Sequence, residues 1–225
     1  MPVQTRTRAK ATTETESTES FLPTALRTRL EKEKAAAAER AAAASGYLAT
    51  PKDGESVEFR VMSPCRWGYE VWYDYKDDDG QDRRGCARWD AKDLMENGFS
   101  EPPAEEIPEG CALRKDGQPL IKTYMAMIVW NYREERFQIW SFTQTSLTEQ
   151  FTKACENPRY GDPRGYDFEW SRVGKELKTR HTLMALPPAA LDEEIKASFE
   201  EFECDLQAYC MGAPGEEVFG SKSEG

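Results

Sequence analysis

Aromatic and cationic side chains alternate closely along several stretches of this chain, a combination that suits the binding of single-stranded nucleic acid. The aromatic residues in this pattern are Trp67, Tyr69, Trp72, Tyr73, Tyr75, Tyr124, Trp130, Tyr132, Trp140 and Trp170. The cationic residues beside them are Arg66, Lys122, Arg133, Arg136, Arg172, Lys175, Lys178 and Arg180. Cations neutralise backbone phosphates, and aromatic rings stack on bases without regard to base sequence.

The competing interpretation is that these rings form an ordinary hydrophobic core. For any single tryptophan, burial in the core is the more frequent outcome. A small barrel has too little interior for the whole set, so we expect some of the rings to face solvent.

Strand periodicity then selects the candidate binding residues. In a strand over residues 120–132, Lys122 falls on the same face as Tyr124 and Trp130. In the last strand-like run, Lys178 and Arg180 fall on the face opposite His181. We therefore expect phosphate contacts from Lys122, Arg172, Lys178 and Arg180, and base stacking on Tyr124, Trp130 and Trp140.

Other site chemistries have weaker sequence signals. Cys65, Cys86 and Cys111 lie in or beside one segment but form no C-x-x-C pair, so buried thiols are favoured over a metal site. A single histidine and the absence of phosphate-loop motifs argue against nucleophilic catalysis and ATP use. Asp167 with Glu176-Leu-Lys178 resembles the carboxylate spacing of a metal-dependent nuclease, and this is the alternative enzyme hypothesis. We expect a protein that is not an enzyme and has no cofactor.

The elements that must position these residues are mostly strands. Alternating runs predict strands near 57–62, 66–75, 120–132, 137–143, 165–172 and 178–186. A capping-box pattern beginning at Ser146 predicts a helix that ends before Pro158. This order favours a mainly β fold, a five-stranded OB-fold-like barrel with one helix before its last hairpin. A β-sandwich with an added helix would have a similar pattern.

The expected organisation has three parts. Residues 1–50 form a disordered to helical N-terminal arm, and residues 51–191 form the barrel, with a long insertion at about 76–118 and a weak helical turn near 91–96. Residues 192–225 form an acidic C-terminal tail with ten acidic residues and two lysines, a net charge of −8. Because the whole chain carries −11, the remaining residues contribute only −3.

The tail has two interpretations. It could be a solvated, solubilising run, or it could compete with nucleic acid and bind partner proteins. The candidate docking residues are Glu216, Glu217, Val218 and Phe219.

No apolar run reaches the roughly 18–20 residues of a membrane helix, and the N-terminus has no apolar signal core. We therefore expect a cytoplasmic protein without membrane contacts, and its six cysteines are expected to be reduced thiols.

Four segments, 68–72, 122–132, 138–146 and 160–188, together resemble a family of bacteriophage single-stranded DNA-binding proteins. The likeness covers about residues 56–191 and is most specific in the VWN, QIW, TQ and GDPRGYD motifs. The resemblance implies an OB-fold that coats single-stranded DNA in replication, recombination and repair. It also implies an acidic C-terminal region that contacts replication proteins such as a polymerase, helicase or primase. The alternative is a replication adaptor with little DNA affinity, and homo-oligomerisation stays open.

Overall fold

The computed structural model describes Arg29 and residues 46–219, and the expected N-terminal arm lies mostly outside these described residues. The chain divides into two compact units, residues 1–40 and 41–225, and the description below concerns the second unit. Within the described residues, no helix is both long and apolar enough to cross a membrane.

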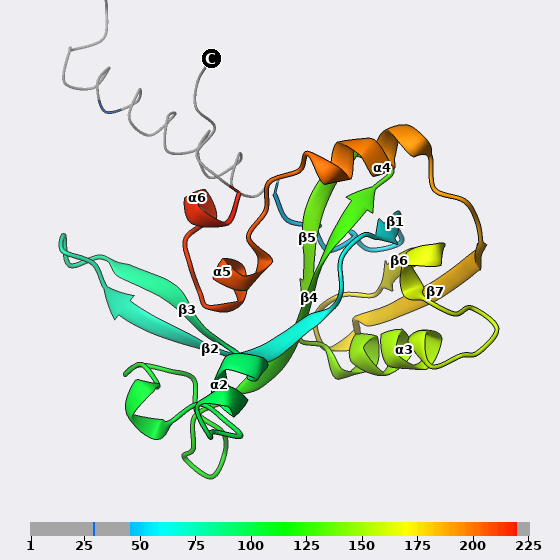
Figure 1. Ribbon diagram of the computed structural model, residues 1–225. Helices are drawn as coiled ribbons and strands as arrows, with labels where there is room; N and C mark the ends of the chain where they lie inside the picture. Colours follow the sequence, from blue (N-terminus) through cyan, green and yellow to red (C-terminus); the bar gives the residue numbers. More distant parts are fainter. Residues whose placement is uncertain (1–28, 30–45, 220–225) are drawn as a thin grey trace, which may run out of the picture. The chain divides into compact units, whose positions relative to one another are not determined.

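Seven antiparallel strands form one open sheet (Figure 1). The strands are β1 (Ser56–Val61), β2 (Arg66–Lys76), β3 (Asp82–Asp90), β4 (Lys122–Asn131), β5 (Arg136–Phe142), β6 (Tyr166–Val173) and β7 (Arg180–Pro188). Their order is β3-β2-β4-β1-β6-β7, and β5 pairs with the other edge of β4. The prediction of a mainly β fold is confirmed, but the described sheet has two strands more than the five expected.

The strand β4 is the centre of the sheet because one of its edges pairs with two consecutive strands. β1 pairs with its Asn131 end and β2 with its Lys122 end. The chain bends between these two strands at Ser63-Pro64, where proline has no N–H to donate. The Ser63 hydroxyl accepts a hydrogen bond from the Ile128 N–H at 2.9 Å, so the β4 backbone stays satisfied at the bend.

The inner face of the curved sheet holds the main core. Phe59, Trp140 and Phe168 pack together, with ring centroids 4.7 Å apart for Phe59–Trp140 and 5.8 Å for Phe59–Phe168. The helix α3 (Thr145–Cys155) covers this core with Leu147 and Phe151. Its existence is confirmed, but the predicted capping box is wrong, since Gln144 is the N-cap and makes no side-chain capping bond.

The edges of β5 and β7 do not pair with each other in the described part of the chain. Residues 46–48 run parallel to β5 instead, with the Leu48 N–H donating to Ile139 and the Ile139 N–H donating to Gly46. On β7, the Gln150 side chain of α3 donates to the His181 carbonyl and accepts from the Leu183 N–H. These contacts satisfy part of each edge while leaving the sheet open.

The strand β3 was missed because its sequence is charged on both faces and lies in the expected insertion. A tight turn creates it, since the Asp77 carboxylate accepts from the N–H groups of Asp79 and Gln81 and from Arg83. The resulting β2–β3 ribbon extends from the rest of the sheet (Figure 1). The helical turn expected near residues 91–96 is confirmed as α2 (Ala91–Glu96).

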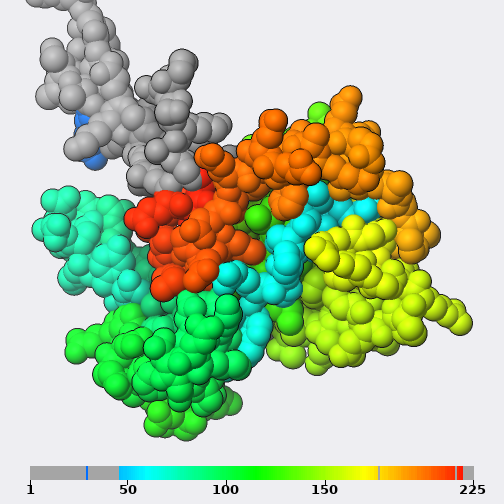
Figure 2. Space-filling model, viewed as in Figure 1, coloured from blue at the N-terminus to red at the C-terminus, as the bar shows by residue number. Residues whose placement is uncertain are grey.

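The expected C-terminal tail is folded as far as the structure describes it. It contains α4 (Glu193–Glu200), α5 (Leu206–Cys210) and α6 (Gly215–Val218). Leu206, Tyr209 and Val218 are buried against the outer face of β4 and β5. Figure 2 shows α5 and α6 in red beside the blue-green β2–β3 ribbon. Burial of these side chains removes apolar surface from water and so stabilises the folded C-terminal segment. The acidic composition of the segment does not predict this burial.

A buried ion pair fixes the outer side of β1 and β6. The Arg60 Nε donates to Asp167 at 2.5 Å, and the same carboxylate accepts from the Tyr132 hydroxyl at 2.9 Å. The Arg60 guanidinium also donates to the carbonyls of Arg164 and Ala189. Because the Arg60 side chain is buried, its charge has lost contact with water, and these hydrogen bonds and the Asp167 carboxylate compensate for that loss.

We expect Asp167→Ala to lower the free energy of unfolding by about 3–5 kcal/mol, because it leaves the Arg60 charge buried without a counter-charge. Urea denaturation measures this loss. The control is Asp82→Ala, which breaks the exposed pair with Lys76 and should cost at most about 1 kcal/mol. Equal losses in the two variants would contradict a structural role for the buried pair.

Candidate nucleic-acid interface

Two of the three rings expected to stack on bases belong to the core. Tyr124 and Trp140 are both 0 % exposed. Tyr124 donates its hydroxyl to the Cys210 carbonyl at 3.0 Å under α5, and Trp140 packs against Phe59 inside the sheet. Neither ring has a face exposed to solvent, so neither can stack on a base in this structure.

The four expected phosphate-binding residues fall into two separate places. Lys122 is exposed at the end of β4 that pairs with β2, opposite Glu70. Arg172 follows Ser171, which pairs with the first residue of β1. Because β1 and β2 pair with opposite ends of β4, Lys122 and Arg172 do not share a groove along this sheet.

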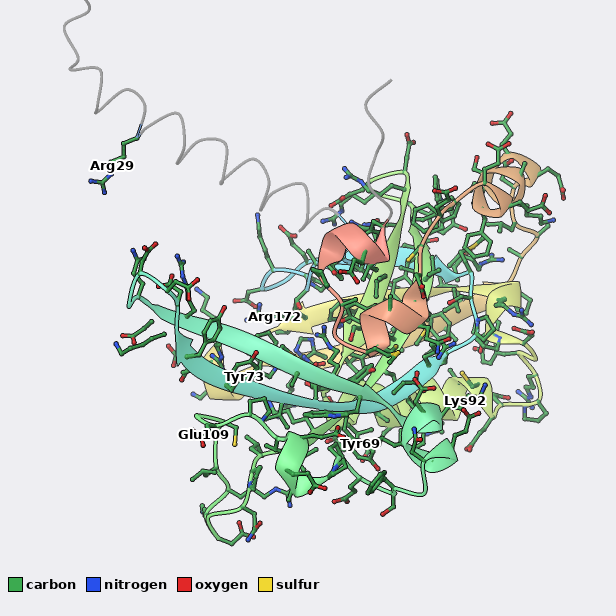
Figure 3. The ribbon with its side chains drawn as sticks, turned by 60° about the vertical axis from the view of Figure 1, so that its left-hand side comes forward. Arg29, Tyr69, Tyr73, Lys92, Glu109 and Arg172 are labelled. Carbon is green, nitrogen blue, oxygen red and sulfur yellow. The ribbon has the colours of Figure 1, made fainter. Side chains whose placement is uncertain are left out.

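The β6–β7 hairpin end gathers the other cations. Lys178 and Arg180 are exposed, as is Lys175. Arg172 is half-buried, and its Nε is buried without a hydrogen-bond partner in the described residues (Figure 3). Burial lowers the pKa of His181, which pairs with Arg172, and the nearby Arg172 charge lowers it further. This end of the hairpin is therefore a cationic surface that an anion could approach.

Trp130 has an acidic environment rather than a cationic one. It is half-buried and packs edge-on against Phe137, with ring centroids 4.8 Å apart. It lines a cavity together with Glu135 and Glu194. Carboxylates in this position repel phosphate, so Trp130 is a poor base-stacking site.

Exposed rings beside exposed cations occur instead on the β2–β3 ribbon. The large exposed rings of β2 are Trp67, Trp72 and Tyr75, and the exposed cations are Lys76, Arg83 and Arg84. Figure 3 shows Tyr69 and Tyr73 on the same ribbon. The alternation of β2 identified these rings as a group, but their exposure depends on the ribbon extending away from the sheet.

Two side-chain contacts fix the position of the Trp72 ring on this ribbon. Its indole Nε1 donates to the Glu70 carboxylate at 2.9 Å, and the Arg84 guanidinium lies over the ring, 5.3 Å from its centroid. The ring is 37 % exposed and lines a cavity of about 340 Å³. A hydrogen bond and a cation–π contact therefore hold the ring in place before any ligand binds.

The anchor of this arrangement is a buried carboxylate. Glu70 accepts from both the Nε and Nη2 of Arg88 at 3.3 Å, and Arg88 in turn lies 4.4 Å over the Tyr209 ring. Burial raises the pKa of Tyr209 to about 12, although Arg88 acts in the opposite direction. The phenol therefore stays neutral at physiological pH, and Glu70 is the counter-charge of Arg88.

The opposite wall of the cavity comes from the start of α3 and the end of β5. Thr143 and Gln144 contribute polar groups there, and Tyr47 and Phe142 contribute rings. Phe142, Thr143 and Gln144 belong to the sequence motif Gln138–Ser146, and Tyr47 forms a bridge with Ile139 of the same motif. The volume and the mixture of rings with a few polar groups are typical of a ligand pocket.

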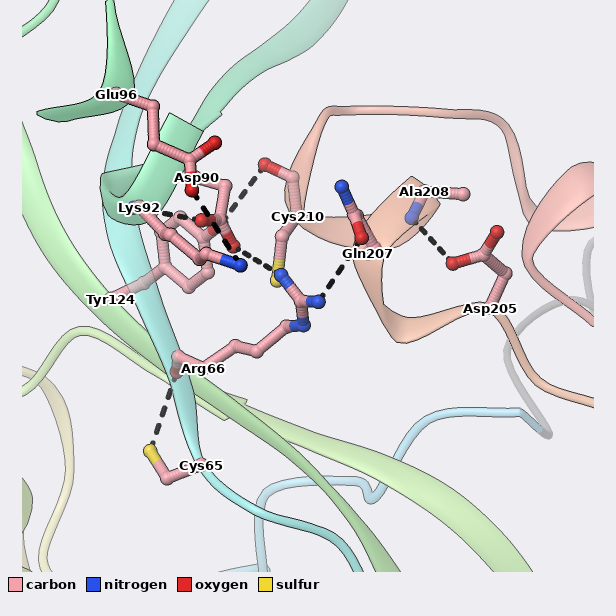
Figure 4. A network of polar contacts seen from close by, with 10 residues as sticks. All are labelled: Cys65, Arg66, Asp90, Lys92, Glu96, Tyr124, Asp205, Gln207, Ala208 and Cys210. Atoms are coloured by element: carbon pink, nitrogen blue, oxygen red, sulfur yellow. Dashed lines mark hydrogen bonds and ion pairs between the residues drawn. The ribbon is translucent and has the colours of Figure 1, made fainter. Parts of the chain in front are cut away.

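The helix α5 forms part of this wall and is held by polar contacts (Figure 4). Arg66 donates to Asp90 at 2.9 Å and to the Gln207 side chain at 3.2 Å. The Tyr124–Cys210 hydrogen bond holds the other end of α5. The C-terminal segment is thus part of the cavity rather than a separate tail.

The tail residues expected to dock with partners are mostly not available in this structure. Val218 is fully buried, and Phe219 packs edge-on against Tyr47 at 5.4 Å. Glu217 is exposed on α6, and the side chain of Glu216 lies outside the described atoms.

The nuclease arrangement does not assemble in the described residues. Asp167 lies within β6, bound by Arg60 and Tyr132, whereas Glu176 and Lys178 lie in the turn beyond that strand. No group of three or more His, Cys, Asp or Glu side chains in the described ranges is placed to hold a metal ion.

Comparison of the chain with protein-family models, with curated proteins and with solved structures finds no match.

We expect Glu70→Gln to lower the free energy of unfolding by about 2 kcal/mol, because the buried Arg88 guanidinium loses its counter-charge. Chemical denaturation measures the change. The matched control is Glu58→Gln on the exposed side of β1, which should stay within about 0.5 kcal/mol of the parent protein. An unchanged stability for Glu70→Gln would show that Arg88 does not need this partner.

Proposed function

We propose that this protein binds single-stranded DNA without sequence specificity and is not an enzyme. The resemblance to phage single-stranded DNA-binding proteins supports this proposal. The strand order also supports it, because a bent β1–β2, then β4, β5, a helix and the β6–β7 hairpin follow the succession of an OB-type barrel. In this proposal the β2–β3 ribbon is an extension between the first and second barrel strands.

The observation that carries the proposal is the oriented Trp72 ring. Glu70 fixes the edge of the indole, Arg84 lies over one face of the ring, and 37 % of the residue stays exposed beside a cavity with polar groups. A base that stacks there gains contact with a ring that has little conformational freedom left to lose. Nearer the ribbon tip, Arg83 pairs with Asp77 at 2.7 Å and Lys76 pairs with Asp82 at 3.0 Å, so Arg84 is the cation that this proposal places beside Trp72.

The β6–β7 hairpin supplies a second phosphate contact region in this proposal. Lys178 and Arg180 keep the role expected from the sequence, and Lys175 lies in the same turn. The overall negative charge of the chain does not prevent this, because single-strand binding depends on local cations.

A protein-interaction adaptor is the second candidate, and one surface favours it. Met95, Phe99 and Met211 are each exposed at about half of their area or slightly more, beside α2 and α5. Phe99 and Met211 line a cavity of about 580 Å³. Apolar side chains gathered at a surface cavity are typical of contact sites. In this second candidate function, the surface would bind a replication protein such as a polymerase, helicase or primase.

We expect Trp72→Ala to weaken oligo(dT) binding by about 10-fold or more, because stacking on an aromatic ring contributes about 1–3 kcal/mol per base. Fluorescence anisotropy of labelled oligo(dT) measures the affinity. The matched control is Trp67→Ala, because Trp67 lies on the opposite face of the same strand with a similar exposure, 39 %. If both variants bind as tightly as the parent protein, the ribbon is not the stacking surface.

We expect Lys178→Gln with Arg180→Gln to weaken binding and to flatten its salt dependence. Loss of two phosphate contacts should reduce the slope of log K against log salt by about 1.4, since each contact on a single strand contributes about 0.7. The control replaces the exposed Lys153 and Lys196, on α3 and α4, by glutamine. An unchanged slope would remove the β6–β7 hairpin from the interface.

A further inference from the structure

A cavity with an acidic rim and aromatic walls lies between the β4–β5 turn and α4. Its volume is about 440 Å³, and it is lined by Trp130, Tyr132, Glu135, Glu194, Ile195 and Ser198. The rings come from the end of β4, one carboxylate comes from the turn, and the other comes from the first turn of α4. Residues 130–135 and the helix α4 thus line the same cavity, which has two aromatic rings and two carboxylates.

The two carboxylates of this cavity have no cationic partner in the described residues. The neighbouring charges pair with one another instead, as Arg136 with Glu134 at 3.2 Å and Lys196 with Glu193 at 2.6 Å. Arg133 donates to the Ser56 carbonyl at 2.7 Å and contacts Glu55 at 3.5 Å. Glu135 and Glu194 therefore keep their negative charge available to a ligand.

Both rings are held in place by contacts with other side chains of the protein. The Tyr132 hydroxyl donates to Asp167 at 2.9 Å, which also binds the buried Arg60. Trp130 packs edge-on against Phe137, whose ring also contacts Phe199 of α4. Each ring therefore has a defined position, and ligand binding needs little reordering of the cavity.

We propose that this cavity binds an arginine side chain of a basic segment of a partner protein. A guanidinium group is planar, so it can stack on the face of Trp130 or Tyr132 while it donates hydrogen bonds to carboxylates. Glu135 and Glu194 are the carboxylates that accept these bonds. The apolar Ile195 contacts the methylene part of the same side chain.

Charge complementarity selects a basic peptide over the other ligand classes. Two unpaired carboxylates repel the phosphates of nucleic acid, so the cavity does not extend the proposed DNA interface. A lysine side chain carries the same charge but has no planar group to stack, and it should bind more weakly. The site is independent of the proposed DNA binding, since it uses none of the ribbon or hairpin cations.

The test uses the full-length protein and a blocked hexapeptide of alternating arginine and glycine, measured by isothermal titration calorimetry at low salt. The variant Glu135→Gln with Glu194→Gln should reduce the peptide affinity by about 10-fold. The control variant Glu200→Gln with Glu201→Gln removes the same charge from the other end of α4 and should change the affinity less than about 2-fold. The lysine counterpart of the peptide should bind the parent protein about 3-fold more weakly.

Three results would overturn the proposal. They are no binding of the arginine peptide to the parent protein, equal losses in the two double variants, and equal affinity for the arginine and lysine peptides. Oligo(dT) affinity should not fall in Glu135→Gln with Glu194→Gln, and a loss there would place nucleic acid in this cavity. Circular dichroism of both double variants confirms that α4 is retained.

Discussion

Burial of both faces of β4 is the constraint on which the rest of this structure depends. Met127 and Val129 face the inner core, and Tyr124, Ala126 and Ile128 face the opposite side. A strand that is apolar on both faces needs a cover on each. The helix α3 helps to cover the inner core, and the C-terminal segment covers the outer face. The acidic C-terminal segment is folded because its apolar side chains, among them Leu206, Tyr209 and Val218, cover the outer face of β4.

The same constraint decides where a ligand can bind. With most of the outer face of β4 and β5 covered, Tyr124 and Phe137 are not accessible, and the exposed rings and cations lie at the periphery. The β2–β3 ribbon presents Trp72 with Arg84, and the β6–β7 hairpin presents Lys178 with Arg180. Acidic groups line the cavity beside α4, which therefore suits a cation better than a phosphate.

Sequence periodicity predicted most of the strands because the alternation of buried and exposed side chains is a local property. The strands β1, β2, β4, β5, β6 and β7 and the helix α3 follow such patterns closely. The strand β3 has no apolar face of its own, and pairing with β2 around the Asp77 turn creates it. The predicted N-cap, Ser146, is two residues later than the observed N-cap, Gln144, because the Ser146 pattern imitates a capping box.

The candidate site was harder to predict than the fold. Parity places Tyr124 and Trp130 on one face but does not say what covers that face. The cover over Tyr124 comes from α5, more than 80 residues further along the chain. Trp140 was assigned to the wrong environment because β5 has large side chains on both faces. Lys178 and Arg180 were placed correctly on the surface, since a hairpin end has little tertiary structure to cover it.

Titration of the intrinsic tryptophan fluorescence of the full-length protein with oligo(dT), at low and at high salt, tests the central claim most directly. Trp72 is 37 % exposed and is the proposed stacking ring, so stacking of a base on it should quench part of the emission. The account predicts quenching that saturates at low salt and shifts to higher oligo(dT) concentrations at high salt. Emission that does not change with oligo(dT) at either salt concentration would contradict single-stranded DNA binding and favour the adaptor.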